Sequence, residues 1–202
     1  MASQADSNGP RLARAALAAL GGWRYAGPVP TERRAVCLAF PHTDNLDGAL
    51  LVLLARSVGL SISWMVKDSW GRGAIGAAVR AAGGIPIDRS RPNGMVGQMV
   101  DAFAKADELY LFIPPEGTRS YTDYWKSGFY RIALGARVPV MPAFLDYRTK
   151  TGGVGPPFRL TGDVRADMSR LREHYGPAAA AMAKYPAKVG PIRLREEDAP
   201  AP

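Results

Sequence analysis

Short apolar runs alternate with segments of helical pattern along this 202-residue chain, and this alternation constrains the fold more than any other feature. The first run, residues 35–40, is apolar throughout, which is typical of a strand buried on both faces of a sheet. Strands that alternate with helices predict an α/β fold with a mixed, mostly parallel central sheet flanked by helices. The expected strands span residues 35–40, 61–66, 85–87, 109–113 and 138–145. The expected helices span residues 11–20, 46–58, 75–82, 92–106, 126–134 and 167–184.

The length of the chain suits a single domain with one hydrophobic core. We expect residues 1–30 to form a polar tail and a short amphipathic helix, residues 31–190 to form the domain, and residues 191–202 to form a flexible tail. Residues 151–157 are rich in glycine and proline, so we expect a surface loop there, followed by a late strand at 158–161.

The expected N-terminal helix carries Arg11 and Arg14 near its start, and Trp23 and Tyr25 follow it. This pattern suits an interfacial helix on an anionic membrane surface, and it suits a helix that covers the core equally well. No apolar run approaches the roughly 18 residues needed to cross a bilayer, and the polar start of the chain shows no signal peptide. We therefore expect a peripheral or monotopic protein on the cytoplasmic side of a membrane, without a transmembrane helix.

The net charge of +8 favours an anionic partner without identifying it, because phospholipid, phosphorylated substrates, coenzyme A and nucleic acid all qualify. The basic residues are scattered and match no nucleic-acid-binding signature, so we expect no nucleic acid partner. Cys37 lies inside an apolar strand and is expected to be a buried structural thiol. With one cysteine and two distant histidines, we expect no metal site.

Polar residues follow the expected strands at their C-terminal ends, where open α/β sheets bind ligands. After the first strand, His42 lies in a loop and Asp47 in the first turn of the next helix. A turn between them can fold the carboxylate onto the imidazole, which fixes the tautomer and leaves the other nitrogen free to accept a proton. An ordinary helix start, with Asp47 facing the helix dipole, explains the same residues when they are taken alone.

Two further clusters carry groups that suit a phosphate. Arg89 ends the strand at 85–87. After the strand at 109–113, Glu116, Thr118 and Arg119 offer an acceptor, a hydroxyl and a guanidinium, while Gly117 lets backbone amides approach a ligand. An apolar strand with prolines at 138–142 completes the series.

These clusters, in this order, resemble the motifs of the glycerolipid acyltransferase family typified by 1-acylglycerol-3-phosphate acyltransferases. His42 and Asp47 match its His-four-residues-Asp motif, and residues 84–89 are similar to its second motif. Residues 115–120 match its third motif closely. Lys67 and residues 125–128 also resemble positions between the motifs, and the similarity covers about residues 35–162.

The resemblance implies that residues 31–190 form an acyltransferase domain of phospholipid biosynthesis. It implies a transfer from acyl-CoA or acyl carrier protein to a lysophospholipid such as 1-acylglycerol-3-phosphate, with His42 as general base, Asp47 as its partner and no cofactor. Lys67, Arg89, Glu116, Gly117, Thr118 and Arg119 are the expected substrate-binding residues. Two alternatives stay open: a lyso-aminolipid or glycolipid acceptor, and a non-catalytic basic protein that binds membranes or nucleic acid.

Overall fold

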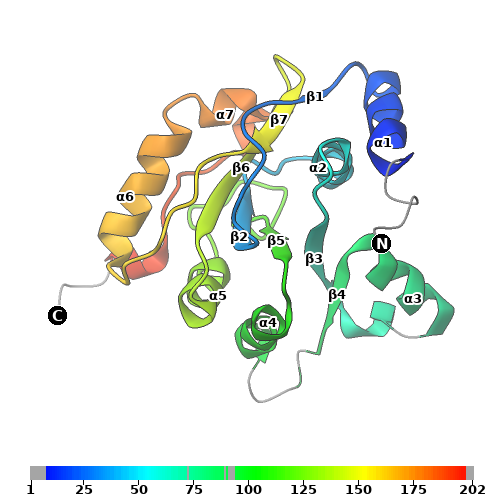
Figure 1. The fold of residues 1–202 in the computed structure, drawn as a ribbon. Helices are drawn as coiled ribbons and strands as arrows, with labels where there is room; N and C mark the ends of the chain where they lie inside the picture. Colours follow the sequence, from blue (N-terminus) through cyan, green and yellow to red (C-terminus); the bar gives the residue numbers. More distant parts are fainter. Residues whose placement is uncertain (1–7, 72, 89, 91–93, 199–202) are drawn as a thin grey trace.

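The central sheet is built from strands that are buried on both faces. Residues 8–71, 73–88, 90 and 94–198, which this computed structural model describes, contain seven strands in a single sheet (Figure 1). On β2 (Arg34–Ala39), Val36 and Leu38 pack into the hydrophobic layer on one face, and Ala35 and Cys37 pack into the layer on the other. Because every side chain after the first is buried, the sequence of this strand is an unbroken apolar run.

The strand order places the three most fully buried of the longer strands side by side at the centre. Within the described residues the order is β1-β7-β6-β2-β5-β3-β4, and every neighbouring pair is parallel except β6 with β7. Cys37 of β2 is level with Phe112 of β5 and Met141 of β6, so the C-terminal ends of these strands meet at one edge. The other strands are β1 (Arg24–Tyr25), β3 (Ile62–Lys67), β4 (Gly84–Ile87), β5 (Leu109–Ile113), β6 (Val140–Asp146) and β7 (Thr151–Val154).

Helices cover both faces of the sheet (Figure 1). The helices α1 (Asn8–Ala19) and α2 (Leu46–Ser57) contribute Leu17 and Leu50 to one hydrophobic layer. The opposite layer receives Phe103, Phe129 and Met168 from three other helices. The remaining helices are α3 (Gly73–Ala82), α4 (Gly94–Lys105), α5 (Gly128–Ala136), α6 (Val164–Tyr175) and α7 (Ala179–Met182). The predicted single-domain α/β fold with a mostly parallel sheet is confirmed.

The glycine-rich stretch at 151–157 is not the loop that its composition predicts. Residues Thr151–Val154 form β7, which pairs antiparallel with β6 on one side and parallel with β1 on the other. A Cβ atom at Gly153 would lie 1.9 Å from the backbone oxygen of Ala26, so the close approach of a neighbouring chain segment requires glycine there. The expected strand at 158–161 is reduced to an isolated bridge between Phe158 and Val140. The expected helix at 167–184 is divided into α6 and α7, with Gly176 between them.

The expected flexible tail is packed along part of its length. Leu194 is fully buried in the hydrophobic layer that contains Phe129 and Met168. Its backbone forms a bridge with Trp125, whose N–H donates to the Arg193 carbonyl at 2.8 Å. Residues Arg195–Asp198 form a 3₁₀ turn, and residues 199–202 lie outside the described part. At the other end of the chain, β1 joins the sheet, so residues 24 and 25 belong to the domain rather than to a separate N-terminal region.

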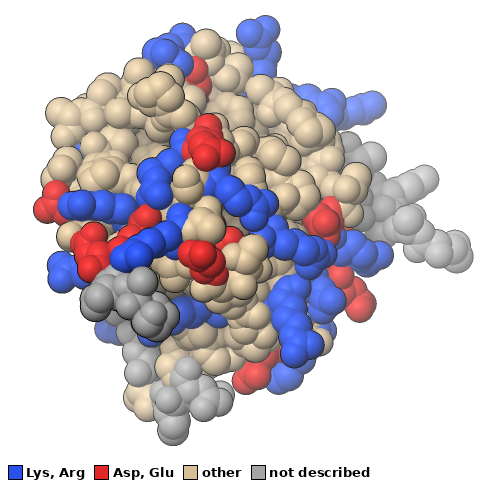
Figure 2. Space-filling view, turned by 90° about the vertical axis from the view of Figure 1, so that its left-hand side faces the viewer, with Lys and Arg blue, Asp and Glu red and all other residues tan. Residues whose placement is uncertain are grey.

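Charged side chains of both signs share the face that carries α6. Figure 2 shows acidic groups interspersed among the lysines and arginines of this face. Arg172 of α6 pairs with Glu197, and Arg131 of α5 pairs with Glu196. In the described residues no helix combines the length and the apolar character needed to cross a membrane.

Candidate active site

The loop between β2 and α2 brings His42 and Asp47 into contact. The imidazole Nδ1 lies 3.3 Å from Asp47 Oδ2. The His42 side chain is 17% exposed and the Asp47 side chain 2%, so the ring can meet a ligand while the carboxylate is shielded from solvent. Asp47 is in the first turn of α2, and the short loop before this helix places the His42 ring next to it. The structure therefore brings together the pair that the sequence predicts to be close.

Several donors converge on the Asp47 carboxylate. Its Oδ2 accepts hydrogen bonds from the backbone N–H groups of Thr43 (2.7 Å) and Asp44 (2.9 Å). Its Oδ1 accepts one from the Tyr147 hydroxyl (2.5 Å). Burial acts to raise the pKa of Asp47, but the hydrogen bonds from His42, Tyr147 and the two amides outweigh it, and the pKa lies below its ordinary value. An ionised carboxylate at this position can accept a hydrogen bond from the Nδ1–H of the imidazole and so fix the orientation of the ring.

Glu116 turns away from solvent and toward the His42 loop. Its side chain accepts a hydrogen bond of 3.0 Å from the backbone N–H of His42, and the residue is 2% exposed. Burial raises the pKa of this carboxyl group to about 8. In this geometry the carboxyl group is enclosed in the protein and its partner is the His42 loop, while a contact between Glu116 and a substrate stays a prediction.

The turn after Glu116 requires a glycine. Gly117 has a φ of +66°, and its N–H donates to the Pro114 carbonyl at 3.1 Å. A Cβ atom there would lie 2.9 Å from Cγ of Lys126. Beyond the turn, Thr118 and Arg119 are exposed, and Thr118 Oγ1 accepts a hydrogen bond from the N–H of Ser120.

Arg119 reaches back to the first motif. Its guanidinium donates a hydrogen bond to the side-chain oxygen of Asn45, at the start of α2. Lys67 is exposed at the end of β3 and does not line the cavity that His42 faces. Arg89 lies outside the described residues. Of the three expected cations, the structure thus places Arg119 beside the His42 loop.

A cavity of about 610 Å³ opens beside His42. Its walls are largely apolar and come from α2, β3 and the ends of β2 and β5, with His42 and Arg119 as its basic groups. Trp64, Met65 and Leu51 line it, whereas Trp70 is 62% exposed and does not. The other lining residues are Ala39, Gly48, Ala49, Val52, Ile62, Phe112 and Pro114. This combination suits a ligand with a long apolar chain and a negatively charged end.

The segment after α7 rests on the same loop, which no sequence motif indicated. Lys184 Nζ donates to Asp44 Oδ2 at 3.0 Å, and Lys188 Nζ donates to the Thr43 carbonyl at 3.4 Å. Tyr147 was also missed, although its position directly after the β6 strand places it at the edge where the strands end. That position is the sequence signal that could have identified it.

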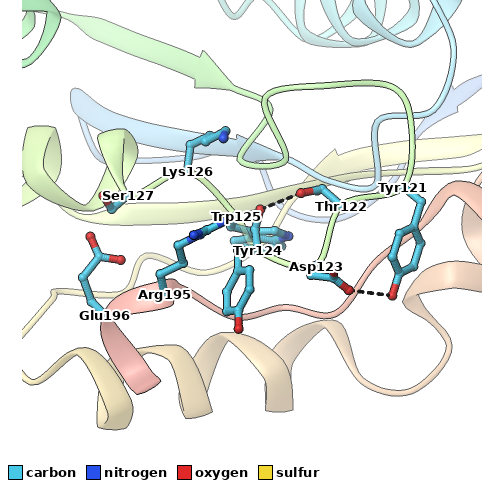
Figure 3. Close-up of a pocket in the computed structure, with 9 residues that line it drawn as sticks. All are labelled: Tyr121, Thr122, Asp123, Tyr124, Trp125, Lys126, Ser127, Arg195 and Glu196. Carbon is cyan, nitrogen blue, oxygen red and sulfur yellow. Dashed lines mark hydrogen bonds between the residues drawn. The ribbon is translucent and has the colours of Figure 1, made fainter. Parts of the chain in front are cut away.

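A second hollow of about 440 Å³ lies between residues 121–127 and the 3₁₀ turn Arg195–Asp198. Figure 3 shows Lys126 directed away from Arg195 and Glu196, so the hollow does not gather its charges around one point. It contains none of the expected site residues. Among the described residues, no group of three or more His, Cys, Asp and Glu side chains is placed to hold a metal ion.

Comparisons with known proteins identify a matching protein family and a similar solved structure. The sequence profile of a protein family described as Acyltransferase matches residues 24–146. Among solved structures, the chain is similar to the 1-acyl-sn-glycerophosphate (LPA) acyltransferase PlsC from Thermotoga maritima, with a TM-score of 0.57 and 14% sequence identity. The alignment covers 84% of this chain and 75% of that one, and at this identity it shows a shared fold. A search of curated protein sequences gives no significant match.

Proposed function

Because this chain belongs to the Acyltransferase family, we propose that it moves a fatty acyl group from acyl-CoA or acyl carrier protein to the hydroxyl of a lysophospholipid such as 1-acylglycerol-3-phosphate. The observation that carries the proposal is the His42 imidazole, held by Asp47 through Nδ1 and facing a largely apolar cavity. The similarity to a solved structure named for this acceptor supports the choice of acceptor.

The reaction we propose needs no acyl-enzyme. With Nδ1 bonded to Asp47, Nε2 of His42 is left to take the proton from the acceptor hydroxyl as that oxygen attacks the thioester carbonyl. The new C–O bond forms, the C–S bond breaks, and the proton passes from the imidazolium to the departing thiolate. Asp47 stabilises the imidazolium in between, and general base catalysis of this kind contributes about 10²–10⁴-fold.

The cavity supports separate binding places for the acyl chain and for the phosphate of the acceptor. The acyl chain would lie along the apolar wall formed by α2 and β3, and the acceptor's phosphate would meet Arg119. A phosphate fixed there would hold the acceptor hydroxyl near His42, so the binding energy of the phosphate would be used to orient the hydroxyl for attack. Lys67 and Arg89 stay proposed as further phosphate contacts.

The N-terminal helix supports a peripheral contact with an anionic membrane on the cytoplasmic side. Leu12 is 70% exposed and follows the exposed Arg11 in the chain, and Leu20, just after the helix, is 42% exposed. Exposed leucines next to arginine suit a helix that enters the headgroup region. Arg14 serves a structural purpose as well, because it donates to the Ser57 carbonyl at the end of α2.

A thiol-release assay tests the proposed reaction. The purified protein is given acyl-CoA or acylated carrier protein with lysophosphatidic acid, or with phosphate-free lyso-aminolipid and glycolipid acceptors. His42→Ala is expected to lower kcat by about 10²-fold or more. His174→Gln is the matched control, because the ring of His174 packs against Phe158 and Tyr175 and does not line the cavity. Undiminished turnover in His42→Ala would exclude the proposed mechanism.

A further inference from the structure

The two oxygens of the Asp47 carboxylate have different partners. Oδ2 faces the His42 ring and the amides of Thr43 and Asp44. Of the described residues, Tyr147 supplies the hydrogen bond to Oδ1, at 2.5 Å. Asp47 is 1% exposed, so its carboxylate is shielded from bulk solvent. The orientation of the carboxylate therefore depends on a residue 100 positions further along the chain.

Tyr147 is itself fixed from two sides. Its backbone N–H donates to the Met182 carbonyl at 2.9 Å. Its ring meets the ring of Trp23 edge to face, with centroids 4.9 Å apart and planes at 84°. Burial, and next to it the neighbouring Asp47, raise the pKa of the Tyr147 hydroxyl, so it stays a proton donor throughout the physiological range.

We infer that Tyr147 is a positioning residue of this enzyme, whose hydroxyl keeps the Asp47 carboxylate aligned with the His42 imidazole. The inference rests on the function proposed above. Rotation of the carboxylate about its Cβ–Cγ bond would carry Oδ2 away from Nδ1, and the bond from Tyr147 to Oδ1 opposes that rotation. Without the hydroxyl, a buried oxygen loses its donor and the ring loses a fixed partner.

The test compares Tyr147→Phe with Tyr25→Phe. Both tyrosine rings pack against the same hydrophobic layer, but the Tyr25 hydroxyl donates to the Pro28 carbonyl at 3.1 Å and not to the site. A hydrogen bond to a charged group supports an expected loss of roughly tenfold in kcat for Tyr147→Phe. The KM values for both substrates should stay within about twofold, because Tyr147 does not line the cavity. Tyr25→Phe should leave both parameters unchanged.

A spectroscopic measurement separates alignment from packing. The chain has two histidines, so comparison with His42→Ala assigns the Nδ1 proton resonance of His42. This resonance should move in Tyr147→Phe and stay in place in Tyr25→Phe. If Tyr147→Phe does not fold, Trp23→Phe, which loosens the ring and keeps the hydroxyl, should lower kcat with an unchanged KM.

The inference is overturned if kcat and the resonance are both unchanged in Tyr147→Phe. It is also overturned if kcat falls while the resonance stays in place, because the hydroxyl would then act through packing alone. Failure of the proposed function looks different: His42→Ala would itself keep its turnover, whatever Tyr147→Phe does.

Discussion

The buried carboxyl group of Glu116 accepts a hydrogen bond from the backbone N–H of His42, which joins the loop after β5 to the loop after β2. The two residues are 74 positions apart in the chain. The sequence predicts that Glu116 contacts a ligand, but through this bond the buried side chain holds the backbone of His42, the proposed base. Its contribution to activity should therefore depend on an acceptor atom at this position and not on a negative charge.

Substitution of Glu116 separates these two roles. Glu116→Gln keeps an oxygen that can accept from the His42 N–H, so we expect most of kcat to remain. Glu116→Ala removes the acceptor, which should cost about 1–3 kcal/mol of stability and reduce kcat through a displaced His42 loop. Urea denaturation and the thiol-release assay measure both effects. Equal loss of kcat in the two variants would show that the charge matters.

The same residue should make stability depend on pH. Burial raises the pKa of Glu116 from 4.5 to about 8. Between these values the folded protein keeps a proton that the unfolded chain has released, so the free energy of unfolding falls as the pH rises through this window. The slope contributed by one group is at most about 1.4 kcal/mol per pH unit. Denaturation at several pH values gives the free energy of unfolding, which should fall less steeply with pH in Glu116→Gln than in the unmodified protein. The same pH dependence in both proteins would contradict the raised pKa of Glu116.

Arg119 should govern the acceptor and not the chemistry. Loss of a charge-assisted contact to phosphate predicts that Arg119→Ala raises the KM for lysophosphatidic acid by roughly tenfold or more, with a smaller change in kcat. The KM for a phosphate-free acceptor should be the same in Arg119→Ala as in the unmodified protein. Arg159→Ala is a suitable control, because Arg159 is exposed and does not line the cavity. Steady-state kinetics that show the same KM for both variants would exclude Arg119 as the phosphate contact.

Gly48 offers a way to shorten the cavity. It lies on α2 in the cavity wall, and a Cβ atom there would have no heavy atom within 4 Å. Gly48→Phe should therefore fold, and its ring should reduce the turnover of long acyl thioesters more than that of short ones. Gly48→Ala serves as the control, because alanine fills little space. It should stabilise the helix by about 1 kcal/mol relative to glycine. A chain-length profile that is identical in both variants would place the acyl group elsewhere.

The His42–Asp47 contact was predicted from the resemblance to a family motif, and the local spacing of the two residues makes the contact possible. A loop and the first helical turn separate the two residues, so their approach depends on few other parts of the chain. The strands were predictable for a similar reason: burial on both faces leaves a run of apolar residues. Both features are properties of short segments.

Contacts between distant segments were not predictable in this way. Nothing near Glu116 indicates that its carboxyl group points inward, because its partner is the amide of His42. Gly152 and Gly153 look like loop residues until β1 and β6 are placed against them. Leu194 has an unremarkable sequence context in an acidic, proline-rich tail, and only the packing of the layer around it explains its burial.

The contacts of Lys184 and Lys188 with the His42 loop have a consequence for biosynthesis. During translation the first motif leaves the ribosome about 140 residues ahead of the lysine that binds Asp44. A nascent chain that has folded its sheet still lacks these two contacts and the carbonyl that Tyr147 uses at Met182. All of these contacts around the loop can therefore form only after α7 and the segment that follows it have been made.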